Sequence, residues 1–461
     1  METTDNRGPA RQLTAVGLPL LIGAVSASLS GIIDTAMMGR YGTTDLAAVA
    51  GTAAVFDVFG NVAMASMIGY QILAPRFAGR QDPAGIRRAL RATAWWCGGL
   101  TLLLTALCLS AGGWLAGLIA GGDAQVQAIG ADYLTARAPA MVLLVPFALL
   151  TVSFNAYGET RWPATAGVLV NVVNLVLDAA LIYGPGPLPR LGATGNGLAT
   201  TLASAAGLAF LIVCARRQGL FRRLAERGPD RPPADFETSV PKLAWPAMVS
   251  TGLDYAILAV FFGVLAAIGT TALAGGRIAF ELMVFLFGVG MAFAAAARIL
   301  VGRAIGASDR HTAWLLWRAG RRILLGSGVL VGVLLLLAPR MAAGLFTSFP
   351  AVRDQTAAVL PLLAAALPLM GLTLANLSLI RALGHTRWDM YANLTAAAGI
   401  QLPIGWWCSS FAGLPGAFVG VFAYWLARAV FTGVICRRLT RGWRTTAAQP
   451  TTPGTEVETT R

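Results

Sequence analysis

The sequence carries little charge. Only 12% of its 461 residues are charged, while 56% are hydrophobic and the mean hydropathy is +0.67. A soluble domain has about 25% charged residues, so this chain does not have the composition of one. Its apolar residues form runs of the length that a bilayer crossing requires, about 20 residues each. We therefore predict an all-α polytopic membrane protein.

The residues that most enzymes and metal sites use are also scarce. The two histidines, His311 and His385, fall in predicted connections, and neither has a partner at a recognised catalytic spacing. The five cysteines stand singly in or beside apolar segments, as small buried apolar side chains do. The sequence has no nucleotide-binding P-loop, no GxSxG and no cluster of metal ligands. We expect no enzymatic activity and no cofactor, with energy taken from an ion gradient.

The net charge of +14 reflects arginines gathered in alternate connections, and Lys242 is the one lysine among the 35 basic residues. This bias is the positive-inside pattern, which places both termini and the central connection in the cytoplasm. No base-stacking aromatics interleave the arginines, so we expect no nucleic-acid partner. The apolar stretch that ends at Met38 is too long for a cleaved signal and is predicted to be the first transmembrane helix. The rich connections contain Arg76, Arg80, Arg87, Arg88 and Arg91, then Arg216, Arg217, Arg222, Arg223, Arg227 and Arg231, then Arg437, Arg438, Arg441 and Arg444; the others contain Arg40, Arg190, Arg340 and Arg353.

About twelve segments are long and apolar enough to span a membrane, and one polar connection divides them into two sets of six. We predict a cytoplasmic tail (1–13), a first lobe (14–214), a cytoplasmic loop (215–242), a second lobe (243–436) and a C-terminal tail (437–461). The predicted helices are 14–38, 46–74, 92–119, 127–156, 163–183, 195–214, 243–267, 272–300, 319–338, 356–382, 390–410 and 416–436.

The two lobes are related by an internal repeat. GTTDLA at 42–47 returns as GTTALA at 269–274, an offset of 227, and GETRW at 158–162 returns as GHTRW at 384–388, an offset of 226. Six helices per copy give both copies the same orientation, with a pseudo-twofold axis along the membrane normal. Two such bundles form the usual frame for transport by alternating access. The same offset pairs Pro19 with Pro246, Arg76 with Arg303 and Gly79 with Gly306.

Acidic residues inside the predicted spans point to a function. A carboxylate at the centre of a bilayer costs about 2.5–3.5 kcal/mol on insertion scales. Asp178 shares a helix face with Asn171 and Asn174, and Asp34 lies at a similar depth in the first helix. The repeat places Phe261 and Ile404 opposite the two acids, so the fold does not need them. We therefore expect Asp34 and Asp178 to share an ion-binding pocket in the outer half of the first lobe.

Other charged residues in the spans carry weaker signals. Asp57 and Asn61 lie four residues apart on the second helix, and the sequence leaves open whether they extend this pocket. Asp254, in the middle of the seventh helix, is a candidate cation site in the second lobe. Two ion pairs are also expected, Arg277 with Glu281 on the eighth helix and Arg137 with Asp132 on the fourth.

The sequence resembles the multidrug and toxic compound extrusion (MATE) family, and its DinF-type bacterial branch in particular. The resemblance is carried by Pro19 and Asp34, by GTTDLA, and by NxxxD at 174–178 followed by GATGNGLATT. It implies twelve helices in two lobes arranged as a V, and exchange of drugs for H⁺ or Na⁺. It also implies a cation site at Asp34, Asn174, Asp178 and Thr200, bending of the first helix at Pro19, and a match of Asp254 to an acid of the NorM-type branch. The sequence has Met370 where NorM-type proteins have an acid, and Thr151 where some DinF-type proteins have an asparagine. These departures favour proton coupling in the first lobe over a Na⁺ site in the second.

From these observations we predict a multi-pass antiporter of the bacterial cytoplasmic membrane. It would export amphipathic, often cationic, organic compounds in exchange for H⁺, working as a monomer. Drug contacts are expected from aromatic and methionine side chains. A Na⁺-coupled antiporter and a lipid-linked sugar flippase remain alternatives, although a flippase needs a cationic cavity. A membrane acyltransferase is disfavoured because neither histidine forms a convincing His–Asp catalytic pair. A purely structural scaffold is disfavoured because Asp34 and Asp178 occur in one repeat only. The candidate drug contacts are Met37, Met38, Met64, Phe56 and Phe287.

Overall fold

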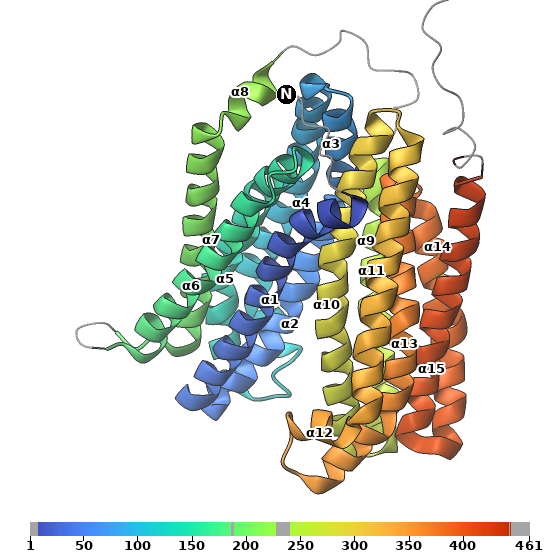
Figure 1. Cartoon of the computed structure of the whole chain (residues 1–461). Helices are drawn as coiled ribbons and strands as arrows, with labels where there is room; N and C mark the ends of the chain where they lie inside the picture. The colour runs from blue at the N-terminus through green and yellow to red at the C-terminus, as the bar shows by residue number, and fades with distance from the viewer. Residues whose placement is uncertain (1–7, 186–188, 227–239, 442, 444–461) are drawn as a thin grey trace, which may run out of the picture.

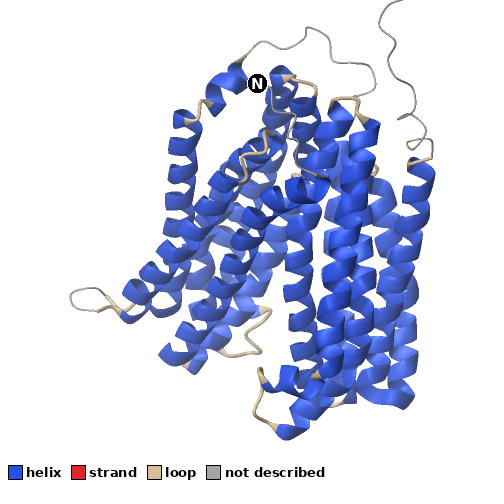
Figure 2. Cartoon of the chain, viewed as in Figure 1, coloured by secondary structure: helices blue, strands red, loops and turns tan. Residues whose placement is uncertain are grey.

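The computed structural model describes residues 8–185, 189–226, 240–441 and 443, and within these ranges it consists of helices and their connections (Figure 2). Eleven helical segments are long and apolar enough to cross a membrane, which confirms a multi-pass membrane protein. The N-lobe contains α1 (Pro9–Tyr41), α2 (Thr43–Ser66), α3 (Ile68–Gly79), α4 (Pro83–Gly117), α5 (Ala124–Ala156), α6 (Arg161–Tyr183), α7 (Gly192–Arg217) and α8 (Leu220–Ala225). The C-lobe contains α9 (Val240–Ile268), α10 (Thr270–Gly306), α11 (Arg310–Leu337), α12 (Pro339–Gly344), α13 (Pro350–Ala382), α14 (Thr386–Ala396), a π-helical stretch η2 (Ala397–Gln401) and α15 (Leu402–Leu439).

The count of eleven differs from the predicted twelve because the last two predicted helices are joined. Gly413 has φ 58° and ψ −135°, a backbone conformation that favours glycine, and the chain turns back there within α15. The return is tight, since a Cβ at Gly416 would lie 2.1 Å from the carbonyl oxygen of Cys408. Two antiparallel helices, joined at Gly413, therefore lie within α15.

Several helices are longer than their apolar cores. The helices α4 and α11 begin at Pro83 and Arg310, about nine residues before the predicted starts, because an N-cap and polar first turns extend them beyond the apolar run. Asp82 accepts a hydrogen bond from the amide of Gly85 at 2.7 Å, and Asp309 accepts one from Thr312 at 2.8 Å. The two caps are repeat partners, so both lobes begin these helices by the same device.

The lobes contact each other at the end where the N-terminus of α1 and the C-terminus of α15 lie, and their helices diverge toward the other end (Figure 1). We call the first end the basic end, because the arginine-rich connections lie there, and the second the open end. A Cβ on Gly79 would lie 2.0 Å from the carbonyl oxygen of Arg303, and a Cβ on Gly306 would lie 2.0 Å from that of Arg76. Glycine at both repeat-related positions therefore lets α3 and α10 cross in backbone contact.

Arginine side chains join the lobes at the same place. Arg76 of α3 donates from Nε to the carbonyl of Ala382 at the end of α13, at 2.7 Å, and its Nη2 contacts the same oxygen. Arg298 of α10 donates to Gln71 of α3 at 2.8 Å. Arg76 also lies against Gly384, while its repeat partner Arg303 lies against Gly158 of the N-lobe. The closure at the basic end thus follows the twofold relation of the repeats.

Candidate functional site

A line of polar side chains joins α1 to α6 inside the N-lobe. Asn171 donates to Ser26 Oγ at 2.7 Å, and Ser30 donates to Asn174 Oδ1 at 3.3 Å. One turn further toward the open end, the carboxyl groups of Asp34 and Asp178 lie close enough to interact with each other. The line ends where the hydroxyl of Tyr183 donates to the carbonyl of Met37 at 2.8 Å. The three- and four-residue spacing of the polar residues on α6 is therefore matched by a four-residue spacing on α1, which also keeps its polar residues on one face.

Asp178 is fully buried and has one amide donor. Asn196, near the start of α7, donates from Nδ2 to Asp178 Oδ1 at 2.9 Å. This asparagine was not singled out from the sequence, although it lies in the GATGNGLATT segment next to the predicted threonine. Thr200 lies one turn further along α7, and its hydroxyl donates to the carbonyl of Asn196 at 3.1 Å. Thr200 therefore contacts the residue that holds Asp178.

Two acidic oxygens at this site have no hydrogen-bond donor among the described residues. They are Oδ1 of Asp34 and Oδ2 of Asp178, and both are buried. Ionised carboxylates can only accept hydrogen bonds, whereas a protonated carboxyl also donates one. A proton shared by the two carboxyls would supply the missing donor. The amide nitrogen of Asn174 is likewise buried without an acceptor in the described part of the chain.

Pro19 lies inside α1, on the basic-end side of this site, and its ring removes a backbone hydrogen bond. The helix continues through it without interruption from Pro9 to Tyr41. Bending at Pro19 stays a prediction. The repeat partner Pro246 occupies the corresponding place inside α9.

Arg137 does not pair with Asp132, so that prediction was wrong. Its Nη2 lies 3.8 Å from Asp57 Oδ1 on α2, and its Nη1 donates to the hydroxyl of Tyr133. Asp132 is exposed, because it lies on a different face of α5 from Arg137, whereas Tyr133 lies one turn from Arg137 on the same face. Arg137 is also close enough to Asp34 and Asp178 to interact with both acids electrostatically.

Asn61, expected beside Asp57, reaches the other lobe. Its amide donates to the hydroxyl of Tyr255 on α9 at 2.8 Å and to the backbone carbonyl of Asp57 at 2.7 Å. Asp57 lies one turn from Asn61 toward the open end. Asp57 is therefore near the point where the lobes come together.

Asp254 belongs to a separate polar chain in the C-lobe. Asn393 donates to Asp254 Oδ1 at 2.6 Å and accepts from the hydroxyl of Tyr424 at 2.8 Å. Arg428 donates to Tyr424 at 2.7 Å and to Asp389 at 2.9 Å. Asp389 also accepts from Arg381 at 2.7 Å. Two acids and two arginines balance in charge along this chain, and Asp389, Tyr424 and Arg428 were missed because each looks ordinary alone.

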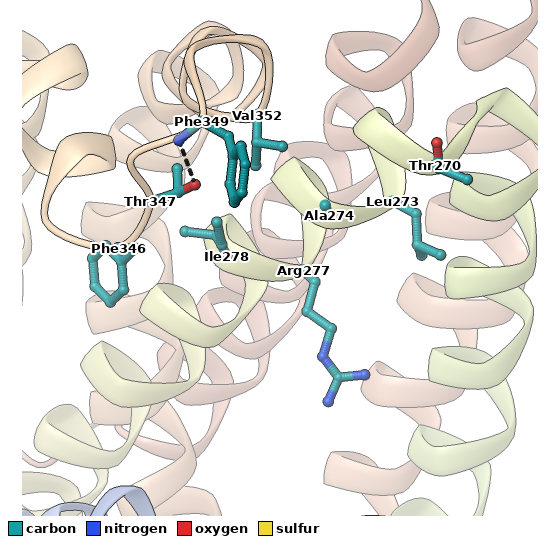
Figure 3. A pocket seen from close by; sticks show the side chains of 9 residues that line it. All are labelled: Thr270, Leu273, Ala274, Arg277, Ile278, Phe346, Thr347, Phe349 and Val352. Atoms are coloured by element: carbon teal, nitrogen blue, oxygen red, sulfur yellow. Dashed lines mark hydrogen bonds between the residues drawn. The ribbon is translucent and has the colours of Figure 1, made fainter. Parts of the chain in front are cut away.

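Arg277 and Glu281 form the expected pair at 3.6 Å, with both side chains largely exposed. A cavity of about 380 Å³ lies beside Arg277, between the start of α10 and the segment that leads into α13 (Figure 3). Phe346, Phe349 and Ile278 make its wall largely apolar. Within the described residues, no three His, Cys, Asp or Glu side chains gather as a metal site.

The fold and the paired acids define a class, a membrane protein of two repeated helical lobes with a pair of neighbouring acids in the first lobe. The MatE family model matches residues 19–180 and 246–407. The two matches have equal length and start 227 residues apart, which confirms the internal repeat. The chain therefore belongs to the MatE family.

Relatives with known names agree with this assignment. "Multidrug resistance protein NorM" of Burkholderia vietnamiensis is 27% identical over 86% of each chain. A Deinococcus radiodurans protein named "Probable multidrug resistance protein NorM" is 30% identical over 89% of this chain and 91% of its own. Since both are named NorM, placement in the DinF-type branch stays a prediction.

Solved structures share the fold. The Vibrio cholerae MATE transporter VcmN in its bent form has a TM-score of 0.83 and 22% identity, over 95% of this chain and 98% of its own. A Pyrococcus furiosus protein, described as a MOP superfamily transporter whose binding pocket has reversed polarity, has a TM-score of 0.84 and 18% identity, over 96% and 100%. These likenesses confirm the two-lobe architecture.

Proposed function

We propose that this protein is a multidrug efflux antiporter that exchanges amphipathic, often cationic, organic compounds for protons. The contact between Asp34 and Asp178, with an oxygen of each buried and lacking a donor, carries the proposal. A fully buried carboxyl and a partly buried one this close cannot easily both ionise, so the pair holds a proton readily. The names of the NorM relatives support multidrug substrates.

The exchange works if proton binding and drug binding oppose each other. When the pair is protonated its charge is reduced, and an organic cation loses part of its attraction to the N-lobe. Loss of the proton restores that attraction, and the relation is reciprocal by thermodynamic necessity. Asn196 holds Asp178 in place in both states, because its amide donates to a carboxyl oxygen that accepts whether or not the group is charged.

The direction of transport follows from the orientation that the arginines support. With the basic end in the cytoplasm, the structure is closed to the cytoplasm and the lobes part toward the outside. Protons from outside would reach the Asp34–Asp178 pair in this state and promote drug release. Separation of the lobes at the crossing of α3 and α10, as they rock toward closure at the open end, would then expose the site to the cytoplasm.

The energetics of this exchange set its limits. One proton moving down a potential of about 100 mV supplies about 2.3 kcal/mol. At about 1.4 kcal/mol per tenfold ratio, that sustains roughly a fortyfold gradient of a neutral drug. A monocationic drug exchanged for one proton draws on the pH gradient alone.

Na⁺ coupling is the second candidate, since carboxylate and amide oxygens of Asp34, Asp178 and Asn174 could hold a cation. A lipid-linked sugar flippase would need a cationic pocket for a pyrophosphate. Among the described residues, the N-lobe site brings together three acids, Asp34, Asp57 and Asp178, and one cationic side chain, Arg137. That balance favours a cationic substrate over an anionic one.

Dye uptake into inside-out membrane vesicles tests the proposal. An imposed pH gradient is compared with an imposed Na⁺ gradient, for the wild type, Asp178→Asn and the control Asp132→Asn. Asp132 lies in the same lobe with its side chain exposed, so the control makes the same chemical change outside the site. We expect proton-driven uptake that Asp178→Asn abolishes and Asp132→Asn retains. Uptake driven by Na⁺ alone, or full uptake by Asp178→Asn, would refute proton exchange at this pair.

A further inference from the structure

The guanidinium group of Arg137 occupies a small site built from three side chains of the N-lobe. Its Nη2 lies 3.8 Å from Asp57 Oδ1, and its central carbon lies 4.4 Å from the centre of the Phe56 ring. Tyr133, one turn before Arg137 on α5, accepts a hydrogen bond from Nη1. A carboxylate, an aromatic face and a phenol oxygen thus surround one cationic group.

These are the groups that recognise an organic cation. An aromatic face attracts a cation that lies within about 6 Å of its centre, and quaternary ammonium ligands are bound this way. A carboxylate adds charge, and a hydroxyl oxygen accepts a hydrogen bond from a protonated amine. The site that holds Arg137 therefore has the chemistry of a site for a cationic drug.

The site is accessible from the open end of the molecule. Asp57 lies one turn beyond Asn61, whose amide bonds to Tyr255 of the C-lobe where the lobes come together. The side chain of Asp57 is 58% exposed, whereas that of Arg137 is only 19% exposed. A ligand that enters between the lobes reaches Asp57 on its exposed side, with Arg137 on the buried side.

The charge contact that holds Arg137 is weak. Its ion pair with Asp57 is long, at 3.8 Å, and the side chain of Asp57 is mostly exposed. The Nε of Arg137 is buried without an acceptor among the described residues. Arg137 also interacts electrostatically with Asp34 and Asp178, so these acids can neutralise its charge after a ligand displaces it from Asp57.

The arrangement exists in one lobe only. The repeat pairs Phe56 with Met283 and Asp57 with Val284, and the corresponding stretch of α13, residues 359–364, reads VLPLLA. Since the C-lobe keeps the same fold with these apolar residues, the fold does not require the charged set. A role in ligand binding explains its restriction to the lobe that holds the paired acids.

We propose that Arg137 is an internal occupant of a cation-binding subsite formed by Asp57, Phe56 and Tyr133, and that a monocationic, amphipathic substrate displaces it. This inference rests on the proposed transport of organic cations and names one of the places where they bind. Arg137 then acts as a competitor that sets affinity and charge selectivity. Removing its positive charge should strengthen the binding of cations, which is the opposite of what loss of a structural arginine would do.

Binding of rhodamine 6G, a monocationic aromatic dye, to the purified full-length protein tests the proposal by fluorescence polarisation, without an ion gradient. We expect the Kd to fall about three- to tenfold in Arg137→Gln and to stay near the wild-type value in Arg137→Lys and in the control Asp132→Asn. Asp57→Asn should raise the Kd about fivefold or more. In the double variant Asp57→Asn/Arg137→Gln the gain from Arg137→Gln should disappear.

An unchanged or higher Kd in folded Arg137→Gln would overturn the proposal, and so would a gain that persists in the double variant. Monodispersity by size-exclusion chromatography establishes folding, and if Arg137→Gln fails it, Asp57→Asn decides, because an unchanged Kd there removes the subsite. Failure of the proposed function appears separately, as wild-type vesicles that bind the dye but show no gradient-driven uptake. Absence of dye binding by wild type and Arg137→Gln alike would overturn both.

Discussion

Asn196 Nδ2 lies 2.9 Å from Oδ1 of the fully buried Asp178 and is the side-chain amide that reaches this acid from α7. The contact ties α7 to the α1–α6 pair at the place where Asp34 and Asp178 meet. Since a hydrogen bond is stronger in a low-dielectric interior, this one holds the carboxyl group of Asp178 in position and stabilises its charged form.

Loss of this amide should impair transport more than loss of the hydroxyl behind it. Asn196→Ala leaves Asp178 without its donor, and we expect at least a tenfold fall in the rate of proton-driven dye uptake. Thr200→Val removes a hydroxyl that bonds to the Asn196 carbonyl, and we expect a fall of about twofold. Uptake rates in vesicles with matched protein levels provide the comparison. Equal losses in the two variants would assign Thr200 to the site itself, as the sequence predicted.

The crossing of α3 and α10 should control closure of the basic end. A Cβ in Gly79→Ala or Gly306→Ala would meet a backbone carbonyl at 2.0 Å, so the lobes must separate there. We expect Ala296→Cys, at a buried position of α10 that faces Gly17 of α1, to react faster with a water-soluble maleimide when combined with either variant than when it is alone. Gly98→Ala is the control, because a Cβ there meets nothing within 4 Å. An unchanged labelling rate in both crossing variants would show that closure does not depend on this contact.

The ion pairs of the C-lobe should differ widely in their effect on stability. Removing one partner of a buried pair leaves the other charge uncompensated, at a cost of about 3–5 kcal/mol. Arg428→Met leaves the buried acids Asp254 and Asp389 with Arg381 as the remaining arginine of their chain, whereas Arg340→Met breaks the exposed pair with Asp354, which contributes about 0–1 kcal/mol. We expect a large fall in the melting temperature for the first variant and almost none for the second, measured in one detergent. Similar melting temperatures would mean that Arg381 alone neutralises Asp389.

Acidification should weaken the contact between the lobes through His385. Burial and the nearby charge of Arg76 lower the pKa of His385 below its usual value of 6.5. Because the folded protein binds the proton less readily than the unfolded chain, stability is full at high pH and is lost as the pH falls through 6.5 toward the folded-state pKa. Melting temperatures between pH 7.5 and pH 5.5 should therefore fall more in the wild type than in His385→Gln. Identical pH profiles would contradict this.

Much of the fold could be predicted from the sequence, because long apolar runs and the spacing of arginines report directly on the membrane. The constant offset between the repeats is enough to divide the chain into its two lobes. Helix ends were predicted less well, since Pro83 and Arg310 begin helices whose first turns are polar and leave no hydropathy signal. The turn at Gly413, in contrast, falls within the predicted connection between the segments 390–410 and 416–436.

At the site, the acids were recognised because a carboxylate is costly in a membrane, and α6 showed its polar face by spacing alone. The partners could not be found this way. Asn196 is remote from Asp178 along the chain, and its neutral amide costs too little to mark it. Arg137 had several possible acids, and only the packing of α5 against α2 selects Asp57 over the neighbouring Asp132.

Proton release on drug binding tests the central claim most directly, because it measures the exchange at the Asp34–Asp178 pair without vesicles or gradients. Purified protein in weakly buffered detergent solution is titrated with rhodamine 6G while a pH indicator counts the protons released, with and without Na⁺. Our account predicts about one proton per bound dye in the wild type, independent of Na⁺, and none in Asp34→Asn or Asp178→Asn. Dye binding without proton release in the wild type, or unchanged release in both variants, would contradict it.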